Sequence, residues 1–204
     1  DKYSETMADI EFEVTLKLDG TSCTYYIVNT NEYNTRKADE TEVIYFGHCS
    51  RNLDTKEGDS TPWKIARESG LKDRMIKFNN DTGRSIAIQG ELMGPSIQNN
   101  REGLHEPKFF LFDIWDIDEQ RYLTADEREL IVDILEVEHV PVLDPSMKVF
   151  EKFKTINEIL DFAEGPSIKH NVREGVVFKS NTLVDGEQVS FKSISNKFLL
   201  KGGD

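Results

Sequence analysis

A lysine at the end of a strand-like segment is the first residue whose position could do chemistry. Residues 11–18 (EFEVTLKL) alternate apolar and polar side chains as a strand does, and Asp19-Gly20 then predicts a turn. Lys17 therefore stands at a strand end, two residues before a carboxylate. It is either a solvated surface cation or a nucleophile. The KxDG tetrad alone does not decide between them, because so short a pattern occurs by chance.

Other segments also place charged or polar residues at strand ends or beside turns. They are GHCSRN (47–52), IQGELMGPSIQNN (88–100), FFLFDIW (109–115), REGVVFKS (173–180) and SFKSISNKFLLK (190–201). Each has an ordinary structural interpretation when it is taken alone. Their order along the chain is what carries information.

Taken in that order, the segments resemble the nucleotidyltransferase domain of the covalent-lysine superfamily, which comprises ATP-dependent RNA and DNA ligases and mRNA capping enzymes. The motifs KLDGTS, SRN, GELMGPSIQNN, FFLFDI, EGVVFK and FKSISNKF follow one another across residues 11–201. GELMGP-x-x-Q and FK-x-x-x-x-KF are more particular to RNA ligases than the lysine motif is. The resemblance therefore favours an ATP-dependent RNA ligase, with ATP as substrate and Mg²⁺ or Mn²⁺ as the metal.

The resemblance makes Lys17 the nucleophile that attacks the α-phosphorus of ATP, which forms a lysyl-AMP intermediate. A free lysine has a pKa of ~10.4, so holding it neutral at pH 7 costs roughly 4 to 5 kcal/mol. Nearby cations, a divalent metal and partial desolvation can supply much of that free energy. Lys192 and Lys197 are the cations expected to do so while they neutralise phosphate oxygens.

Two carboxylates complete the implied catalytic set. Glu174 is expected to hold the divalent metal near the α-phosphate, since Mg²⁺ takes oxygen ligands from one or two carboxylates, water and phosphates. Glu91 is expected on the nucleotide ribose or in the metal network, because a carboxylate accepts hydrogen bonds from hydroxyl groups. The ordinary alternative for Glu174 is a polar residue at the start of a strand.

Further nucleotide-binding residues follow from the same resemblance. Arg51 is expected at the ribose or the phosphate end, with a surface loop arginine as the alternative, and Asn52 is equally typical of a turn. Gly20 is expected to supply the backbone freedom of its turn. Asp19 either stabilises that turn or helps to arrange the nucleic acid ends. Val177, in EGVVFK, is also expected at the nucleotide.

An aromatic residue of FFLFDIW is expected to stack on the adenine ring, which contributes on the order of 0.5 to 1.5 kcal/mol beyond burial. Phe112 is the choice and Phe110 the substitute, whereas a buried strand would contain such residues in any case. Gln98 is either a polar contact or part of a loop.

The sequence departs from the family pattern at two positions. Some RNA ligases carry K-x-K on the last strand, but here Ile194 follows Lys192, so only Lys192 is carried over to phosphate contact. Leu16 stands where several relatives have a glutamate that reads the adenine amino group. Lys179, at the end of EGVVFK, is interpreted as a supporting or surface lysine.

Composition limits the class of protein. The 204 residues carry a formal net charge of −13, which argues against a protein that simply coats nucleic acid. The two cysteines, Cys23 and Cys49, do not make a disulfide framework, so we expect an intracellular reducing compartment such as the cytoplasm. No apolar run approaches a membrane span and no signal peptide is visible, so no membrane partner is expected.

The order of elements predicts an α+β fold. Strands are predicted at 11–18, 22–29, 42–47, 84–91, 108–114, 173–180 and 187–194. One helix is predicted at 60–70, and residues 124–164 follow a helical pattern, opened by Thr124 and Glu127 at capping-box spacing. The family fold is an antiparallel-sheet nucleotidyltransferase domain, ATP-grasp-like, with flanking helices.

We therefore interpret residues 1–204 as an adenylation domain, and expect it to be a fragment of a longer protein that lacks a flanking OB-like or other RNA-binding module. We expect a monomer that uses ATP, forms AMP and joins RNA ends at a nick or break, as in RNA repair. A DNA ligase or a capping guanylyltransferase domain is the alternative enzyme. A non-catalytic nucleotide- or RNA-binding domain of the same fold is the alternative of another class.

Overall fold

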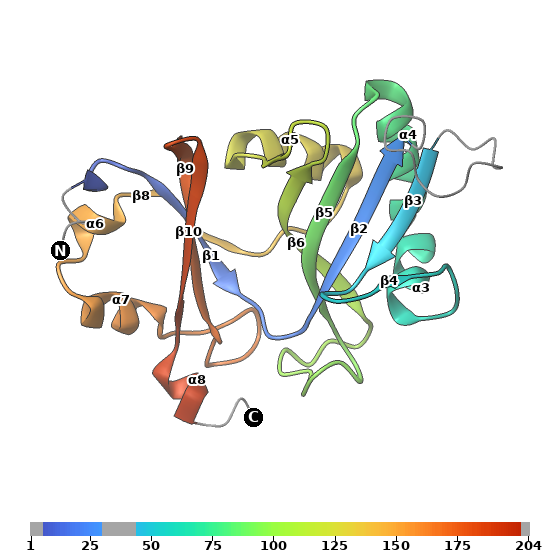
Figure 1. Cartoon of the computed structure of the whole chain (residues 1–204). Helices are drawn as coiled ribbons and strands as arrows, with labels where there is room; N and C mark the ends of the chain where they lie inside the picture. The colour runs from blue at the N-terminus through green and yellow to red at the C-terminus, as the bar shows by residue number, and fades with distance from the viewer. Residues whose placement is uncertain (1–5, 30–43, 201–204) are drawn as a thin grey trace. The chain divides into compact units, whose positions relative to one another are not determined.

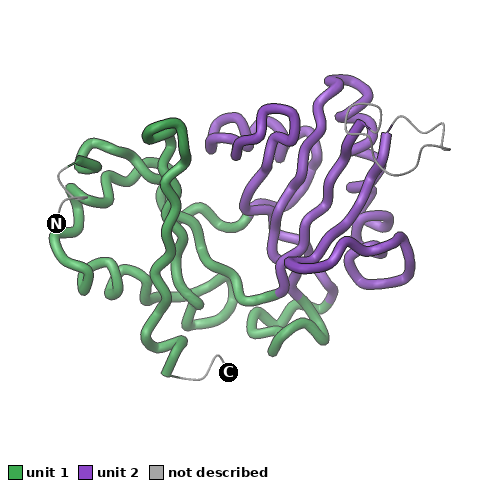
Figure 2. Tube along the Cα trace, viewed as in Figure 1, with its two compact units in different colours: residues 1–20, 94–105, 140–204 green, residues 21–93, 106–139 purple. Residues whose placement is uncertain are grey.

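The computed structural model describes residues 6–29 and 44–200. The chain forms two compact units, which Figure 2 colours separately. Unit 1 contains residues 1–20, 94–105 and 140–204, and unit 2 contains residues 21–93 and 106–139. Each unit is thus assembled from segments that are far apart in the sequence. Among the described residues, no helix is both long and apolar enough to span a bilayer.

The sheet of unit 1 has four antiparallel strands in the order β10-β9-β1-β8 (Figure 1). They are β1 (Phe12–Lys17), β8 (Val142–Met147), β9 (Gly175–Val184) and β10 (Glu187–Ile194). The strand that carries Lys17 is therefore paired on both sides. Strand β8 lies at the edge of the sheet, where Pro145 is tolerated because a backbone donor can be missing there.

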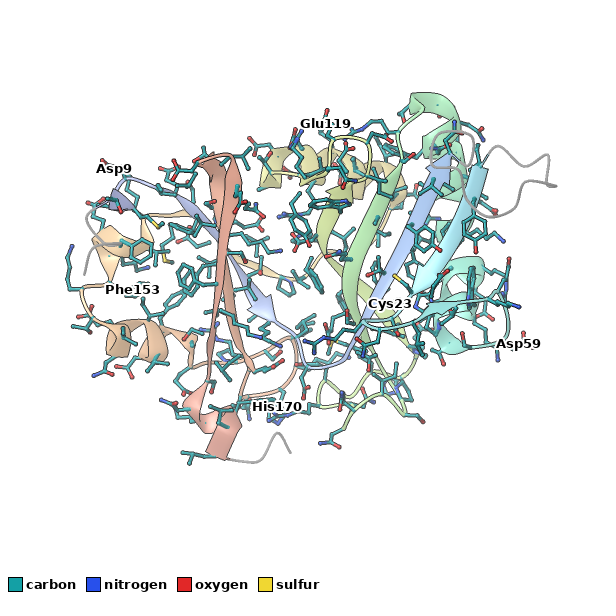
Figure 3. The ribbon with its side chains drawn as sticks, in the orientation of Figure 1. Asp9, Cys23, Asp59, Glu119, Phe153 and His170 are labelled. Carbon is teal, nitrogen blue, oxygen red and sulfur yellow. The ribbon has the colours of Figure 1, made fainter. Side chains whose placement is uncertain are left out.

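One face of this sheet forms the hydrophobic core of unit 1, together with α6 (Val149–Lys152) and α7 (Ile156–Ala163). Figure 3 shows the side chain of Phe153 among those that pack against this core. Because Phe12 and Val14 alternate with Glu13 and Thr15 along β1, the other face of the sheet carries polar side chains. The buried members of the core are Phe12, Val14, Met147, Val149, Ala163, Val176 and Phe178.

A tight turn joins the last two strands and fixes their register. Asp185 and Gly186 have φ values of 53° and 85°, the left-handed pair that a two-residue hairpin turn requires. The turn confirms the loop expected between the two late strands. An irregularity between Gln188 and Ser190 then shifts the register, and beyond it Lys192 lies opposite Val177.

The sheet of unit 2 has six strands in the order β4-β3-β2-β5-β6-β7. Along β2, the side chains of Cys23, Tyr25 and Ile27 are buried and alternate with more exposed ones, as the sequence predicts for a half-buried strand. The strands are β2 (Thr21–Asn29), β3 (Ile44–Cys49), β4 (Asp54–Thr55), β5 (Ile86–Met93), β6 (Lys108–Asp116) and β7 (Arg121–Tyr122). The strand predicted at 42–47 is confirmed from Ile44 onward, and residues 42 and 43 lie outside the described residues.

Unit 2 also contains the helices α3 (Thr61–Glu68), α4 (Leu71–Thr82) and α5 (Ala125–Leu135). Helix α3 confirms the helix predicted at 60–70. The capping box of Thr124 and Glu127 at the start of α5 is also confirmed. Two antiparallel sheets with helices make an α+β fold, as predicted.

Helix α4 was not predicted from the sequence. Its N-cap is Gly70, in the left-handed conformation, which ends α3 and begins α4 at the same residue. A glycine at this position predicts the end of a helix. The N-cap position of α4 also lacks the Ser, Thr, Asp or Asn side chain that would indicate the start of another helix.

The helical pattern predicted over 124–164 is confirmed at both ends and is wrong in its middle. Strand β8 separates α5 from the short helix α6, and a break at Phe153–Thr155 precedes α7. Strand β8 pairs with β1 and so belongs to the sheet that carries Lys17.

The turn predicted at Asp19-Gly20 does not fold the chain back into a hairpin. Strand β1 ends at Lys17 and β2 begins at Thr21 in the other sheet, so Leu18 to Gly20 connect two sheets. The φ angle of Gly20 is not in the left-handed region, so the connection does not need a glycine for a positive φ.

Candidate functional site

The predicted nucleophile and the predicted metal ligand are in direct contact. The Lys17 Nζ atom lies 2.5 Å from Oε1 of Glu174, and the two side chains are 24% and 15% exposed. The residues are far apart in the sequence. The antiparallel pairing of β1 and β9 places Lys17 opposite Gly175, directly after Glu174. The register of the sheet therefore brings the pair together.

Lys192 shares a sheet face with Lys17. Thr15, Val177 and Lys192 lie abreast on β1, β9 and β10, and Thr15 lies two residues from Lys17 on the same face. Two steps of about 4.8 Å across the sheet and two residues of about 3.4 Å along it separate the Cα atoms of Lys17 and Lys192 by roughly 12 Å. Two extended lysine side chains can reach one phosphate group across that span.

Gly175 lets the strands approach closely beside Glu174. A Cβ atom on Gly175 would lie 2.2 Å from the carbonyl oxygen of Ser193, which is backbone and cannot move aside cheaply. This explains the Glu-Gly pair. Glu174 lies where its carboxylate reaches Lys17, and the next residue, Gly175, lies too close to the neighbouring strand to have a side chain.

The backbone around Glu174 is held from both sides. The guanidinium of Arg173 donates to the carbonyl oxygens of Ala163 and Glu164, at 2.9 and 2.8 Å, at the C-terminal end of α7. Burial lowers the pKa of Arg173. The amide of Ser195 donates to the carbonyl oxygen of Glu174. These contacts position Glu174 before any ligand binds.

Lys197 lies at the start of α8 (Asn196–Leu200), next to a second carboxylate. The side chain of Glu164 accepts hydrogen bonds from the Lys197 amide at 3.1 Å and from the Ser195 hydroxyl at 2.9 Å. Burial would raise the pKa of Glu164, but these hydrogen bonds and the Lys197 charge lower it overall. The Lys197 side chain is exposed, with its Nζ atom 3.8 Å from Glu164, so it stays available for the predicted phosphate contact.

The surface interpretation of Lys179 is wrong. Lys179 is 5% exposed and lies opposite Glu13, which is 6% exposed, in the β1–β9 register. Both residues lie on the sheet face of Lys17, because Glu13 precedes Lys17 by four residues in the same strand. The supporting interpretation of Lys179 agrees with this position.

The chemistry of Glu174 fits a divalent cation. Its Oε2 atom is buried and has no hydrogen-bond partner, while Oε1 contacts Lys17. Within the described residues there is no group of three or more His, Cys, Asp or Glu side chains that could hold a metal by itself. Mg²⁺ does not need such a cage, because it binds through one or two carboxylates, water and substrate phosphates.

Unit 2 contains the predicted residues Glu91 and Phe112. Glu91 lies on β5 between Ser22 and Phe110 in the paired strands. Strand β6 has a β-bulge between the pairs Gly90–Leu111 and Gln89–Asp113, so Phe112 is the extra residue. A bulge re-aims a side chain and is enriched at functional sites. Phe112 is half-buried whereas Phe110 is 3% exposed, which favours Phe112 for stacking.

Gly90 serves the same purpose in unit 2 as Gly175 does in unit 1. A Cβ atom on Gly90 would lie 2.4 Å from the carbonyl oxygen of Phe110. The side chain of Cys23 is buried in the neighbouring strand, and burial raises the pKa of its thiol to about 12. That thiol is protonated at neutral pH, which agrees with the ordinary role predicted for Cys23.

Arg51 and Asn52 are exposed in the turn between β3 and β4. Behind the turn, Thr55 forms hydrogen bonds with His48 Nδ1 at 2.7 Å and with the indole N–H of Trp63 at 3.0 Å. This network anchors the hairpin, so the turn is presented from a rigid base.

Gln98 was predicted to be either a polar contact or part of a loop, and its side chain makes a polar contact. Its amide nitrogen donates to the carbonyl oxygen of Gly20 at 3.2 Å, which fixes the connection that follows Lys17. Asp19 is half-buried in the same connection. The positioning residues Arg173 and Glu164 were missed, because nothing in their local pattern shows which distant backbone groups they meet.

Comparison with protein families places the chain. The model of the RNA ligase family matches residues 10–194, and the chain therefore belongs to that family. Comparison with curated proteins finds no match.

Solved structures of Naegleria gruberi RNA ligase are similar to this chain. A lysine-to-alanine variant with ATP and Mn is 39% identical, with a TM-score of 0.78 over 98% of this chain and 54% of that chain. The enzyme with PPi is 40% identical, with a TM-score of 0.77 over 100% of this chain and 55% of that chain. A lysine-to-methionine variant with AMP and Mn is 39% identical, with a TM-score of 0.76 over 98% and 54%. The chain spans about half the length of these relatives.

Proposed function

We propose that this chain is the adenylyltransferase part of an ATP-dependent RNA ligase. The observation that carries the proposal is the contact between Lys17 and Glu174, on a sheet face that also holds Lys192. A nucleophile, a carboxylate and a cation on one rigid sheet are the groups that nucleotidyl transfer needs, because positioning and charge neutralisation supply most of its catalysis.

In the first step, the Lys17 amine attacks the α-phosphorus of ATP. A P–N bond forms, the bond between the α-phosphorus and the bridging oxygen breaks, and pyrophosphate leaves. Only an unprotonated amine can attack, so Lys17 must lose a proton before the P–N bond forms. Lys192 and Lys197 neutralise the charge on the phosphate oxygens. Glu174 would hold Mg²⁺ or Mn²⁺, which would supply charge neutralisation when bound. Glu91 stays a proposed contact of the ribose or of the metal network.

Two further transfers complete the proposed reaction. An RNA 5′-phosphate oxygen attacks the phosphorus of lysyl-AMP, which forms an adenylylated RNA end and frees Lys17. The adjacent 3′-hydroxyl then attacks the 5′-phosphorus, a phosphodiester bond forms and AMP leaves. Asp19, in the connection after the nucleophile, is proposed to help arrange these ends.

The nucleoside contacts proposed for unit 2 are Glu91 to the ribose, Phe112 to the adenine ring, and Arg51 with Asn52 to the ribose or phosphate. Val177, which lies between Thr15 and Lys192 on the polar face, is proposed to contact the nucleotide from unit 1. The net charge of −13 supports the further proposal that a monomer of this protein holds RNA partly through a flanking module.

Labelled nucleotides test this function. Incubation with Mg²⁺ and α-labelled ATP should label the protein, and α-labelled GTP should not. Nicked duplexes with either RNA or DNA at the 3′-hydroxyl side then test joining, and the RNA nick should be sealed faster. Label from GTP alone would indicate a capping enzyme, equal sealing of both nicks would favour a DNA ligase, and no label from either nucleotide would contradict catalysis.

A further inference from the structure

A half-buried arginine in unit 1 has a shielded guanidinium without a polar partner among the described residues. All three guanidinium nitrogens of Arg101 are shielded from solvent and have no hydrogen-bond partner among the described residues. Its close neighbour is the ring of Phe198 in α8, whose centroid lies 4.6 Å from the Arg101 Cζ atom. Arg101 belongs to the loop 94–105, and the mechanism above does not use it.

This arrangement is unfavourable in the free protein. A guanidinium carries five N–H donors and a permanent charge, and removal from water is costly unless the charge is paired and its donors are bonded. Stacking on an aromatic ring returns only part of that free energy. A buried polar group without a partner is rare in a native protein and calls for an explanation, such as an ion that binds there.

The position of Arg101 in the loop is fixed, because its sequence neighbours Asn100 and Glu102 are both held by hydrogen bonds. The Asn100 side chain exchanges two hydrogen bonds of 3.0 Å with the backbone of Leu104. The Glu102 carboxylate accepts from the amides of Lys169 and His170, at 2.5 and 3.1 Å. Figure 3 labels His170 in the segment that leads into β9. The carboxylate next to Arg101 is therefore already occupied and does not pair with it.

The same loop is strained and adjoins the lysine motif. Ser96, Gln98 and Asn100 all have positive φ, at 65°, 44° and 44°, which non-glycine residues rarely adopt. Gln98 contacts the backbone of Gly20 after the nucleophile. Strain of this kind persists where a fixed geometry is needed for function.

Helix α8, which contacts Arg101, is also connected by hydrogen bonds to Glu174. Phe198 donates its amide to the Ser195 hydroxyl, and the Ser195 amide donates to the Glu174 carbonyl oxygen. Helix α8, which contributes Phe198 to the contact with Arg101, has no buried residue and is therefore lightly packed. Access of a ligand to the guanidinium would require a displacement of α8.

We infer that Arg101 binds a phosphate group of a substrate, which pairs with the guanidinium through two hydrogen bonds. The inference rests on the proposed function, because that function supplies two phosphate sources, the ATP triphosphate and the RNA 5′-phosphate. In the free protein, Phe198 holds the guanidinium in place. The ligand completes the site.

Binding and single-step kinetics test the inference with purified full chain. The variants are Arg101→Gln, which removes the charge, and Phe198→Leu, which removes only the ring. Arg67→Gln is the matched control, since Arg67 is a half-exposed arginine bonded to the Gly58 carbonyl in unit 2. Probes are ATP with Mg²⁺ and a 5′-phosphorylated RNA oligonucleotide, each beside its analogue without the phosphates (adenosine, and the 5′-hydroxyl RNA).

Arg101→Gln should weaken binding of one phosphorylated probe about 10- to 100-fold and leave its unphosphorylated analogue unchanged. Weaker ATP binding with slower protein labelling assigns the ATP triphosphate. Weaker binding of the 5′-phosphorylated RNA, with slower joining of pre-adenylylated RNA and normal labelling, assigns the RNA end. Thermal unfolding of the free Arg101→Gln protein should be unchanged or raised, because an unpaired charge is removed.

Equal losses in Arg101→Gln and Phe198→Leu, accompanied by lower unfolding temperatures, would mean that Arg101 only clamps α8 and would overturn the inference. Unchanged binding of both phosphorylated probes would overturn it as well. Failure of the wild-type protein to become labelled would reject the proposed function, while the binding comparison would still decide whether Arg101 contacts phosphate.

Discussion

Unit 1 and unit 2 are both built on antiparallel sheets, but they use the faces of those sheets differently. In unit 1, apolar residues of β1 enter the core while Glu13, Thr15 and Lys17 share the other face. In unit 2, the face opposite the core carries uncharged residues such as Thr24, Tyr26 and Trp115 beside the acids Glu91 and Asp113.

The difference separates two tasks. Lys17 and Lys192, which are proposed to act on phosphate, lie on β1 and β10 of one sheet, so backbone register sets their spacing. Of the residues proposed for the nucleoside, Glu91 lies on β5, whereas Phe112 lies in a bulge and Arg51 with Asn52 in a turn, where single side chains can be presented independently. Substitutions in each unit can test this division of tasks.

Phe178→Ala should destabilise unit 1 by about 3 to 5 kcal/mol, because Phe178 is fully buried and its ring stacks on Phe191 at 4.7 Å. Both tryptophans, Trp63 and Trp115, belong to unit 2. Denaturant unfolding followed by circular dichroism should therefore shift, while the tryptophan fluorescence transition should shift less. Ile114→Ala is the reciprocal control in unit 2, and identical shifts of both signals in both variants would show that the units unfold as one.

Glu174→Gln should slow formation of the protein–AMP adduct about 100-fold, a change of roughly 2.7 kcal/mol. Glutamine keeps the shape of the side chain and removes the charge that holds Lys17 and would hold the metal. The rate of labelling by ATP at saturating Mg²⁺ measures the effect. Glu187→Gln, an exposed carboxylate of β10, is the control, and a Glu174→Gln rate within twofold of the wild type would contradict the role.

Phe112→Leu should weaken ATP binding by about 2- to 10-fold, which corresponds to a lost stacking contribution of about 0.5 to 1.5 kcal/mol. Phe110→Leu should instead lower the stability of unit 2 with little effect on ATP, because Phe110 is buried. Calorimetric ATP titration and denaturant unfolding of both variants make the comparison. The reverse pattern would assign the stacking ring to Phe110.

The smallest expected effect is on the pH dependence of unit 2. Burial lowers the pKa of His48 below its ordinary value of 6.5, an effect that the Asp54 charge partly offsets. The unfolded chain therefore binds a proton more readily, and this contribution to stability is complete above pH 6.5 and is lost as the pH falls. Fluorescence-detected unfolding between about pH 7.5 and 5.5 should lose less stability in His48→Gln than in the wild type. An equal loss in both proteins would exclude His48 as a source of the pH dependence.

The sequence predicts elements whose signals are local. The alternation of apolar and polar residues in β1 and β2 and the capping box of α5 each depend on residues close together in the sequence, and both are present in the structure as predicted. Strand β8 could not be predicted, because a proline such as Pro145 argues against a strand. The proline is accommodated only because β8 pairs with β1 at the edge of the sheet. Helix α4 was hidden because one glycine both ends a helix and begins the next.

The candidate site shows the same limit. The residue types of Lys17, Glu174 and Lys192 and their motif order suggest a chemistry, but only the β1–β9–β10 register places them on one face. The contacts of Arg173 and the buried position of Lys179 arise from packing between distant segments. No local pattern encodes them, so they could not be predicted.

Intact-mass spectrometry after incubation with ATP and Mg²⁺ tests the nucleophile most directly. Wild-type protein should gain the mass of one AMP, peptide mapping should place it on residue 17, and a folded Lys17→Ala protein should gain nothing. An AMP adduct of equal yield on Lys17→Ala would show that the 2.5 Å contact of this amine with Glu174 is an ordinary ion pair and that the covalent chemistry lies elsewhere.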